Sequence, residues 1–295
     1  MKKYYKIVVI FAVILCIGVG AAYVYVKADS KKTAPEYYFD VKGREYLQNM
    51  TTYSSESYDY GGYLIALDSS IYDEKTNVAY CVFTVKQNDG GTNFLKDGSW
   101  GSFGEDNHLE LSTMLSGTIN YKHELIGDTL YIYLKYSATE QYEEYRGKIF
   151  LVDKSKNESL GVEPTEHVFC LVGSDSREYK NEEQTIYLSP ICLSITEEKD
   201  SDIDRIVLNY KNGNQKVVTE ENRFKDTEEN QLKGEIVGSG NSSAVSGNQQ
   251  QGQIIGEGGT VKKSVQKYLF YTPVNIKEIE SITVNDVTYT CTEIE

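Results

Sequence analysis

The most pointed chemical candidate in the sequence is a cysteine close to its C-terminal end. Cys291 closes the run Thr288-Tyr289-Thr290-Cys291, where a thiolate at the end of a strand could act as a nucleophile. Such a nucleophile needs a histidine or another cation beside it to lower its pKa. No arginine follows Cys291, and the nearest preceding histidine is His167. We therefore interpret Cys291 as a side chain that faces the core of a hairpin, and we predict no catalytic residue.

An acidic segment offers a second candidate, because its carboxylates alternate as they do in calcium-binding loops. Asp200, Asp202 and Asp204 occupy every second position. A complete EF-hand loop would need glycine where Arg205 stands and glutamate where Lys211 stands. We interpret the segment as a solvated turn, with a looser calcium site as the alternative. The three histidines are scattered, without metal-ligand spacing, so we predict no metal site and no cofactor.

A glycine-rich loop holds the single tryptophan of the chain. Trp100 and Phe103 lie within residues 96–107, which read KDGSWGSFGEDN. Aromatic side chains at a loop tip can hold a glycan or a peptide, and these two residues are our candidates for ligand binding. The alternative is that Trp100 folds back onto the core.

The charge of the chain limits its partners. The formal net charge is −14 at pH 7, and so acidic a surface repels nucleic acid. We therefore expect no nucleic-acid partner. The acidity suits cations or basic partners, and solubility alone also explains it.

An uncharged run near the N-terminus predicts a membrane anchor. Residues 7–26 read IVVIFAVILCIGVGAAYVYV, and a helix of that length spans roughly 30 Å, the thickness of a bilayer core. Lys2, Lys3 and Lys6 precede the run and favour an N-terminus inside the cell. We expect residues 1–6 in the cytoplasm and the remainder outside a single-pass anchor. Cleavage after Ala28 is the alternative.

The sequence predicts that strands position these residues. Short alternating runs rich in tyrosine are separated by turns such as Gly127-Asp128, Asn212-Gly213 and Asn285-Asp286. An Asn-Gly turn favours type I′. We predict an all-β fold of two β-sandwich (Ig-like) domains, at residues 37–153 and 166–295. Residues 238–260 contain no aromatic side chain, and we expect a disordered insertion there.

Four cysteines lie beyond the predicted anchor, namely Cys81, Cys170, Cys192 and Cys291. An even number of cysteines in an oxidising compartment permits disulfides, with three connectivities. Cys81 shares a strand face with apolar neighbours and reads as a small core residue. Free buried thiols and at least one disulfide remain alternatives.

Three segments of the second predicted domain carry a family resemblance. They are Ser189-Pro190 with the strand after it, residues 204–213 (DRIVLNYKNG), and residues 271–285 (YTPVNIKEIESITVN). These motifs resemble the extracytoplasmic β-rich region of anti-sigma-factor-like membrane proteins of Gram-positive bacteria. The resemblance covers about a third of the chain and implies paired β-sandwiches outside the membrane. Residues 1–6 are too few for a sigma-binding domain, so we do not expect that activity.

Two classes of function follow from these observations. The first is a non-enzymatic module of the cell envelope that binds a protein, a peptide or a glycan and assists sensing or signalling. The second is an enzyme that modifies envelope polymers at a site the sequence does not reveal. We predict the binding module.

Overall fold

The structure is a computed structural model that describes residues 31–91, 102–103, 109–113, 117–138, 144–156, 165–173, 176–181, 184–197, 203–220, 231–238 and 264–292. Within these ranges the only α-helix is the short α2 (Ala34–Tyr38), so the predicted all-β class is confirmed. Three 3-10 turns accompany it, η1 (Arg44–Leu47), η3 (Lys154–Lys156) and η4 (Ile276–Glu278). No helix in these ranges is long and apolar enough to cross a membrane. The predicted anchor, residues 7–26, lies outside them.

The first sheet, sheet A, is antiparallel with the strand order β1-β3-β4-β8-β7, and β2 also pairs with β3. Its strands are β1 (Thr51–Tyr53), β2 (Ser57–Tyr60), β3 (Tyr63–Asp73), β4 (Val78–Gln87), β7 (Gly117–Ile126) and β8 (Thr129–Ala138). Gly127 takes a φ of 63° in the two-residue turn between β7 and β8, which confirms the predicted hairpin.

The second sheet, sheet B, packs face to face against sheet A. Its order is β10-β9-β6-β5, and its strands are β5 (Ser102–Phe103), β6 (Leu109–Ser112), β9 (Lys148–Asp153) and β10 (Thr165–Cys170). The core between the sheets includes Phe83 of β4 and Phe169 of β10, whose rings meet edge to face at 5.1 Å. We expected β10 at the start of the second domain, but its pairing with β9 joins it to the first core.

The remaining strands form one closed sheet, here called the barrel, in place of the predicted second sandwich. Its order is β11-β12-β13-β17-β16-β15-β14-β18-β19. Closure comes from β11 and β19, where Tyr179 lies opposite Cys291 and Lys180 lies opposite Thr290. Closing the sheet removes its free edges, which two open sheets would leave exposed. The strands are β11 (Arg177–Lys180), β12 (Thr185–Leu188), β13 (Cys192–Glu197), β14 (Ile206–Tyr210), β15 (Gln215–Glu220), β16 (Gln231–Gly238), β17 (Ser264–Phe270), β18 (Ile279–Val284) and β19 (Val287–Cys291).

Two further expectations about the barrel need correction. Gly238, where the disordered insertion was predicted to begin, is the last residue of β16, and residues 239–260 lie outside the described ranges. The turn after β14 has a positive φ at Gly213 alone, which differs from a type I′ turn. The turn predicted at Asn285-Asp286, between β18 and β19, is confirmed, because both residues have the positive φ of a type I′ turn.

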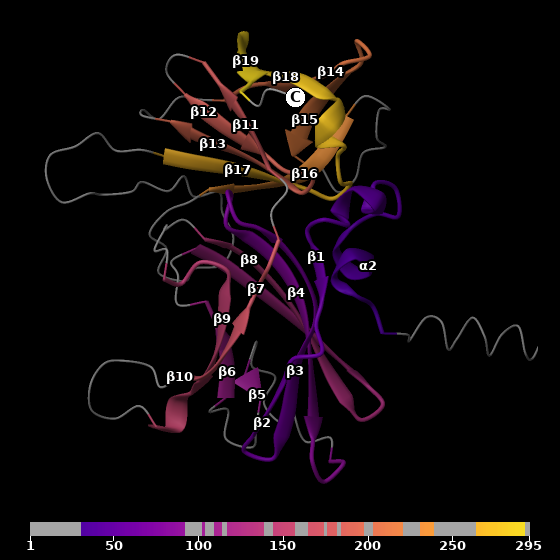
Figure 1. Ribbon diagram of the computed structural model, residues 1–295, viewed down its shortest axis with the longest axis vertical. Coiled ribbons are helices and arrows are strands. Elements are labelled where there is room, and N and C mark those ends of the chain that lie inside the picture. Colours follow the sequence, from indigo (N-terminus) through magenta and orange to yellow (C-terminus); the bar gives the residue numbers. More distant parts are fainter. Residues whose placement is uncertain are drawn as a thin grey trace, which may run out of the picture.

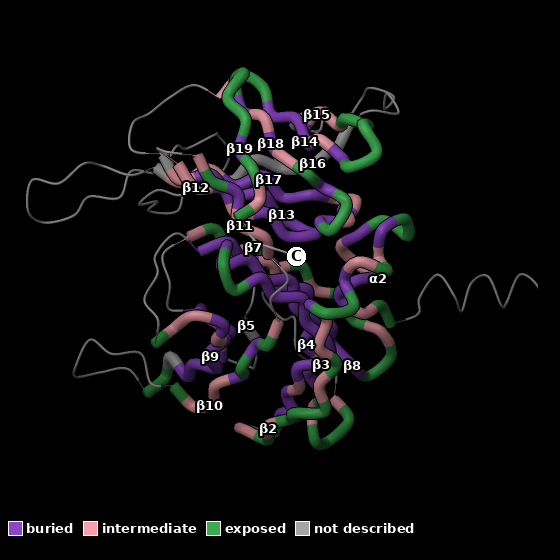
Figure 2. The backbone as a smooth tube through the Cα atoms, turned by 45° about the horizontal axis from the view of Figure 1, so that its top comes forward, coloured by how far each residue is buried: buried purple, intermediate pink, exposed green. Residues whose placement is uncertain are grey.

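A third hydrophobic cluster covers the face of sheet A that points away from sheet B. It combines residues of β4 and β8 with residues of α2 and its neighbourhood, and with Ile191, Cys192 and Leu269 of the barrel part. β4 is consequently buried on both faces, and its sequence is almost continuously apolar, as expected for such a strand. Figure 1 shows the barrel above the two sheets with α2 beside β4, and Figure 2 shows β3, β4 and β8 as largely buried backbone.

Polar groups are also buried where sheet A meets the barrel. Lys267 of β17 is only 3% exposed, and its Nζ donates a hydrogen bond of 2.5 Å to the carbonyl of Ala138. Asp73 is fully buried and accepts hydrogen bonds from the hydroxyls of Thr76 and Ser176. Burial lowers the pKa of Lys267 to about 8. A buried amine that bonds a carbonyl of β8 therefore ties the barrel to sheet A.

The four described cysteines are free thiols, so the alternative of a disulfide among them is not realised. Cys81 and Cys192 are buried, Cys291 is half-buried and Cys170 is exposed. Burial raises the pKa of the Cys192 thiol to about 12 and raises that of Cys81 as well. Both buried thiols therefore act as small apolar side chains.

The buried amine of Lys267 predicts a pH-dependent stability. Its pKa in the folded chain lies below the ordinary value of 10.5, so the unfolded chain binds more protons between about pH 8 and 10.5, and stability rises with pH over that window. Relative to Lys267→Met, the wild-type free energy of unfolding should gain on the order of 2–3 kcal/mol between pH 8 and pH 10. Urea unfolding measures this difference, with the exposed Lys277→Met as control. A difference that stays constant with pH contradicts the prediction.

Candidate functional site: a tyrosine-lined pocket

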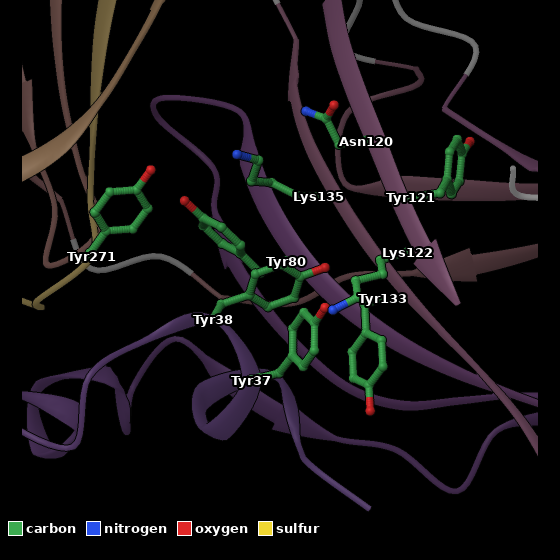
Figure 3. Close-up of a pocket in the computed structure, with 9 residues that line it drawn as sticks. All are labelled: Tyr37, Tyr38, Tyr80, Asn120, Tyr121, Lys122, Tyr133, Lys135 and Tyr271. Carbon is green, nitrogen blue, oxygen red and sulfur yellow. The ribbon is translucent and has the colours of Figure 1, made fainter. Parts of the chain in front are cut away.

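The floor of the pocket is the face of sheet A that points away from sheet B. Tyr80 of β4 lies opposite Lys135 of β8, which lies opposite Asn120 of β7. Two residues further along β7, Lys122 lies opposite Tyr133 of β8. Because side chains alternate between the faces of a sheet, the register brings these five residues to one face. Figure 3 shows Asn120 and Lys122 on one side of the β7 ribbon and Tyr121 on the other.

The walls come from α2 and from the chain after β17, which contribute Tyr37, Tyr38 and Tyr271. α2 starts with a capping box between Thr33 and Glu36, an arrangement that satisfies backbone donors at the start of a helix. The backbone N–H of Ala34 donates to the hydroxyl of Ser69 at 2.9 Å, which fixes the helix to β3.

Asp40 joins these two walls. Its backbone N–H donates to the carbonyl of Tyr271 at 3.1 Å, and its carboxylate accepts a hydrogen bond of 2.6 Å from the hydroxyl of Thr272. The chain after β17 is therefore held beside the segment that follows α2.

The aromatic rings of the pocket form a connected series. Tyr37 stacks on Tyr133 with ring centroids 3.6 Å apart and planes inclined by 11°. Tyr38 meets Tyr37 edge to face at 4.8 Å and lies 4.8 Å from Tyr80. The cavity beside these rings measures about 140 Å³, which accommodates one ring-sized group. The rings therefore present a rigid, largely apolar surface.

The charge inside the pocket is positive. Lys122 and Lys135 line it, and the described lining residues include no aspartate or glutamate. The Nζ of Lys122 lies 5.6 Å from the ring centroid of Tyr37, within the range of a cation–π contact. Burial raises the pKa of Tyr38 and of Tyr133, so both hydroxyls stay neutral at physiological pH. The arrangement can bind a compact anionic group against aromatic rings.

The pocket lining that the structure describes contains none of the residues singled out from the sequence. Trp100, Asp200 and Asp202 are outside the described ranges, and Phe103 lies in β5, opposite Leu109. Asp204 is exposed, and its backbone N–H donates to the side chain of Asn285. Cys291 packs against the core of the barrel, as predicted. Within the residues that the structure describes, no group of three or more histidine, cysteine, aspartate or glutamate side chains could hold a metal ion.

Sequence reasoning missed the pocket, although one signal pointed toward it. Residues 129–138 read TLYIYLKYSA, so Tyr131, Tyr133 and Lys135 share one face of a strand whose other face is apolar and ends in Tyr136 and Ala138. Lysine and tyrosine both bury an apolar part and keep a polar end in water. Their alternation on one face of a mostly apolar strand indicates that this face is only partly shielded from solvent.

Comparison with known proteins leaves the family open. No family model matches the chain, and no curated protein matches it. Among solved structures, the crystal structure of a conserved domain protein from Bacillus anthracis aligns with 86% of this chain and 80% of its own length. The sequence identity is 11% and the TM-score is 0.37.

The stack of Tyr37 on Tyr133 predicts how the pocket tolerates substitution. Tyr37→Ala should lower the free energy of unfolding by about 1–2 kcal/mol, because it removes an aromatic pair and the area that the pair buries. Tyr37→Phe keeps the ring and should stay within about 0.5 kcal/mol of the wild type. Urea unfolding monitored by circular dichroism gives both values. Equal losses in the two variants would show that the hydroxyl matters and the ring stack does not.

Proposed function

We propose that this chain is an extracytoplasmic binding module of the bacterial cell envelope, anchored by residues 7–26, and that the tyrosine-lined pocket is its ligand site. The uncharged run at residues 7–26 and the lysines before it support the anchor and its orientation. The observation that carries the binding proposal is the cavity of about 140 Å³ between Tyr37, Tyr38 and Tyr80, with Lys122 and Lys135 on its floor.

The chemistry of this pocket favours an acidic peptide segment of a partner protein. A glutamate or aspartate side chain is compact enough for the cavity, and its carboxylate complements Lys122 and Lys135. The stacked rings exclude water from one side of the pocket, which strengthens an ion pair inside it. An enzyme that hydrolyses envelope polymers usually works with paired carboxylates, whereas the described lining here is tyrosine, lysine and asparagine. These features support binding over hydrolysis, with a sensing or signalling-accessory role for the module.

Removing the two lysine charges tests the ligand site. A fluorescent peptide that contains glutamate should bind the double variant Lys122→Met/Lys135→Met on the order of tenfold more weakly than the wild type, because two ion pairs are lost. Methionine keeps the length and apolar stem of lysine. The matched control is Lys86→Met, an exposed lysine of β4. Equal affinity in the double variant and the control would contradict the proposal, and tighter binding of acidic glycans than of peptides would reassign the ligand.

Protease accessibility in intact cells tests the proposed topology. Added protease should degrade the protein beyond Lys27 while a fragment that contains the N-terminus stays in the membrane, because residues 7–26 would be shielded by lipid. Western blots against tags at both ends report the two fragments. Protection of the C-terminal tag until the membrane is permeabilised would place the sheets and the barrel inside the cell.

A further inference from the structure

β7 is the last strand of sheet A and offers a long edge. It pairs with β8 in an unbroken register from Gly117 opposite Ala138 to Ile126 opposite Thr129. Among the strands that the structure describes, none pairs with the other edge of β7. A ten-residue edge strand is a ready template for another strand, because an edge strand presents a row of backbone N–H and C=O groups to which a further strand can bond.

The turn after β7 determines which backbone groups point outward. In a hairpin with a two-residue loop, the residues that flank the loop exchange both hydrogen bonds, so Ile126 bonds to Thr129. Because the bonded pairs alternate along an antiparallel ladder, the even-numbered residues of β7 bond to β8. Ile119 and Tyr121 therefore direct their N–H and C=O groups away from β8, and no described group bonds to them there.

An independent hydrogen bond supports this assignment. Ala138 lies opposite Gly117, and in the alternation above this is a pair without mutual hydrogen bonds. Its N–H should then point away from β7, toward β4. The N–H of Ala138 donates to the carbonyl of Asn77, the residue before β4, at 3.1 Å. This hydrogen bond agrees with the assignment from the turn, in which the even-numbered residues of β7 bond to β8 and the odd-numbered ones point outward.

The side chains next to this edge belong to the pocket. Asn120 and Lys122, which line it, lie on β7 itself, with Tyr37 beside Lys122 (Figure 3). A strand added to β7 would lie about 4.8 Å away and would continue the row of Tyr133 and Lys122 with one of its own side chains. The residue opposite Lys122 would form a pair without mutual hydrogen bonds, in which side chains approach most closely.

We propose that β7 receives an extended acidic peptide of a partner protein as an added antiparallel strand. The backbone of this peptide bonds to Ile119 and Tyr121, and an acidic side chain opposite Lys122 reaches into the tyrosine-lined pocket. Charge decides the occupant, because Lys122 is exposed and forms no ion pair with a described residue, and an opposite charge directly across a strand pair is favourable. The proposal rests on the proposed binding function and specifies how the ligand is held.

Backbone methylation of a peptide tests strand addition without altering the protein. The probe is an acetylated, amidated seven-residue peptide in which glutamate alternates with valine, and the full chain is held in lipid nanodiscs. With glutamate opposite Lys122, the valine residues lie opposite Ile119 and Tyr121 and direct their N–H groups toward β7. N-methylation of the valines should weaken binding by more than about tenfold, because several hydrogen bonds are lost. N-methylation of the glutamates should change the affinity by less than about twofold.

A charge exchange completes the test. Lys122→Glu should invert the preference, so that a peptide alternating lysine with valine binds more tightly than the glutamate peptide, whereas Lys86→Glu should keep the wild-type preference. If both methylated peptides bind equally while the double lysine variant still loses affinity, the pocket binds its ligand without strand addition and this inference is wrong. Failure of every peptide to bind overturns it too. Sedimentation that shows a dimer disrupted by Lys122→Glu would make a second copy of the chain the occupant.

Discussion

β4 is buried on both faces, and the arrangement of the two sheets, α2 and the barrel depends on keeping both faces away from water. Sheet B covers one face, where Phe83 meets Phe169. The other face carries Tyr80 and Val82, and a single sheet cannot cover it, so α2 and the barrel pack there together. Sheet B, α2 and the barrel therefore all pack against the same strand, since exposing either face of β4 would return large apolar side chains to water. The pocket lies at the edge of the face of sheet A that α2 and the barrel cover, next to the edge strand β7.

The sequence predicted local features well where they depend on neighbouring residues. The four long strands of sheet A (β3, β4, β7 and β8), the hairpin at Gly127 and the core-facing side chain of Cys291 all follow from alternation and turn composition, whereas the short strands β1 and β2 were not predicted. Closure of the barrel was not predictable in this way. The two-pair contact between β11 and β19 is set by the three-dimensional path of the chain, and nothing in either strand alone indicates the other. A closed sheet and a sandwich have the same alternation along each strand.

The pocket escaped prediction for a different physical reason. α2 has five residues, too few to show a helical period, so its sequence did not reveal that Tyr37 and Tyr38 form a wall. The expected ligand residues Trp100 and Phe103 stood out because aromatic side chains in glycine-rich loops are conspicuous. The other tyrosines of the pocket lie within or directly after regular strands, where their sequence pattern is that of ordinary core residues. Only the register of three strands brings Tyr80, Lys135 and Asn120 into one row.

Closure of the barrel by its first and last strands also constrains the order in which the chain can fold during synthesis. The described residues of the core between sheets A and B end at Leu171, so this core can form while the rest of the chain is still being synthesised. The barrel must wait, because Thr292 bonds to Glu178 across a sequence separation of 114 residues. During that interval the barrel residues that cover Tyr80 and Val82 are not yet in place. The edges of β11 and β14 that later pair with β19 and β18 are also open. Among the described barrel strands β19 emerges last, so its pairing with β11 ends the period in which open strand edges can pair wrongly. A product truncated before β19 would keep those edges open.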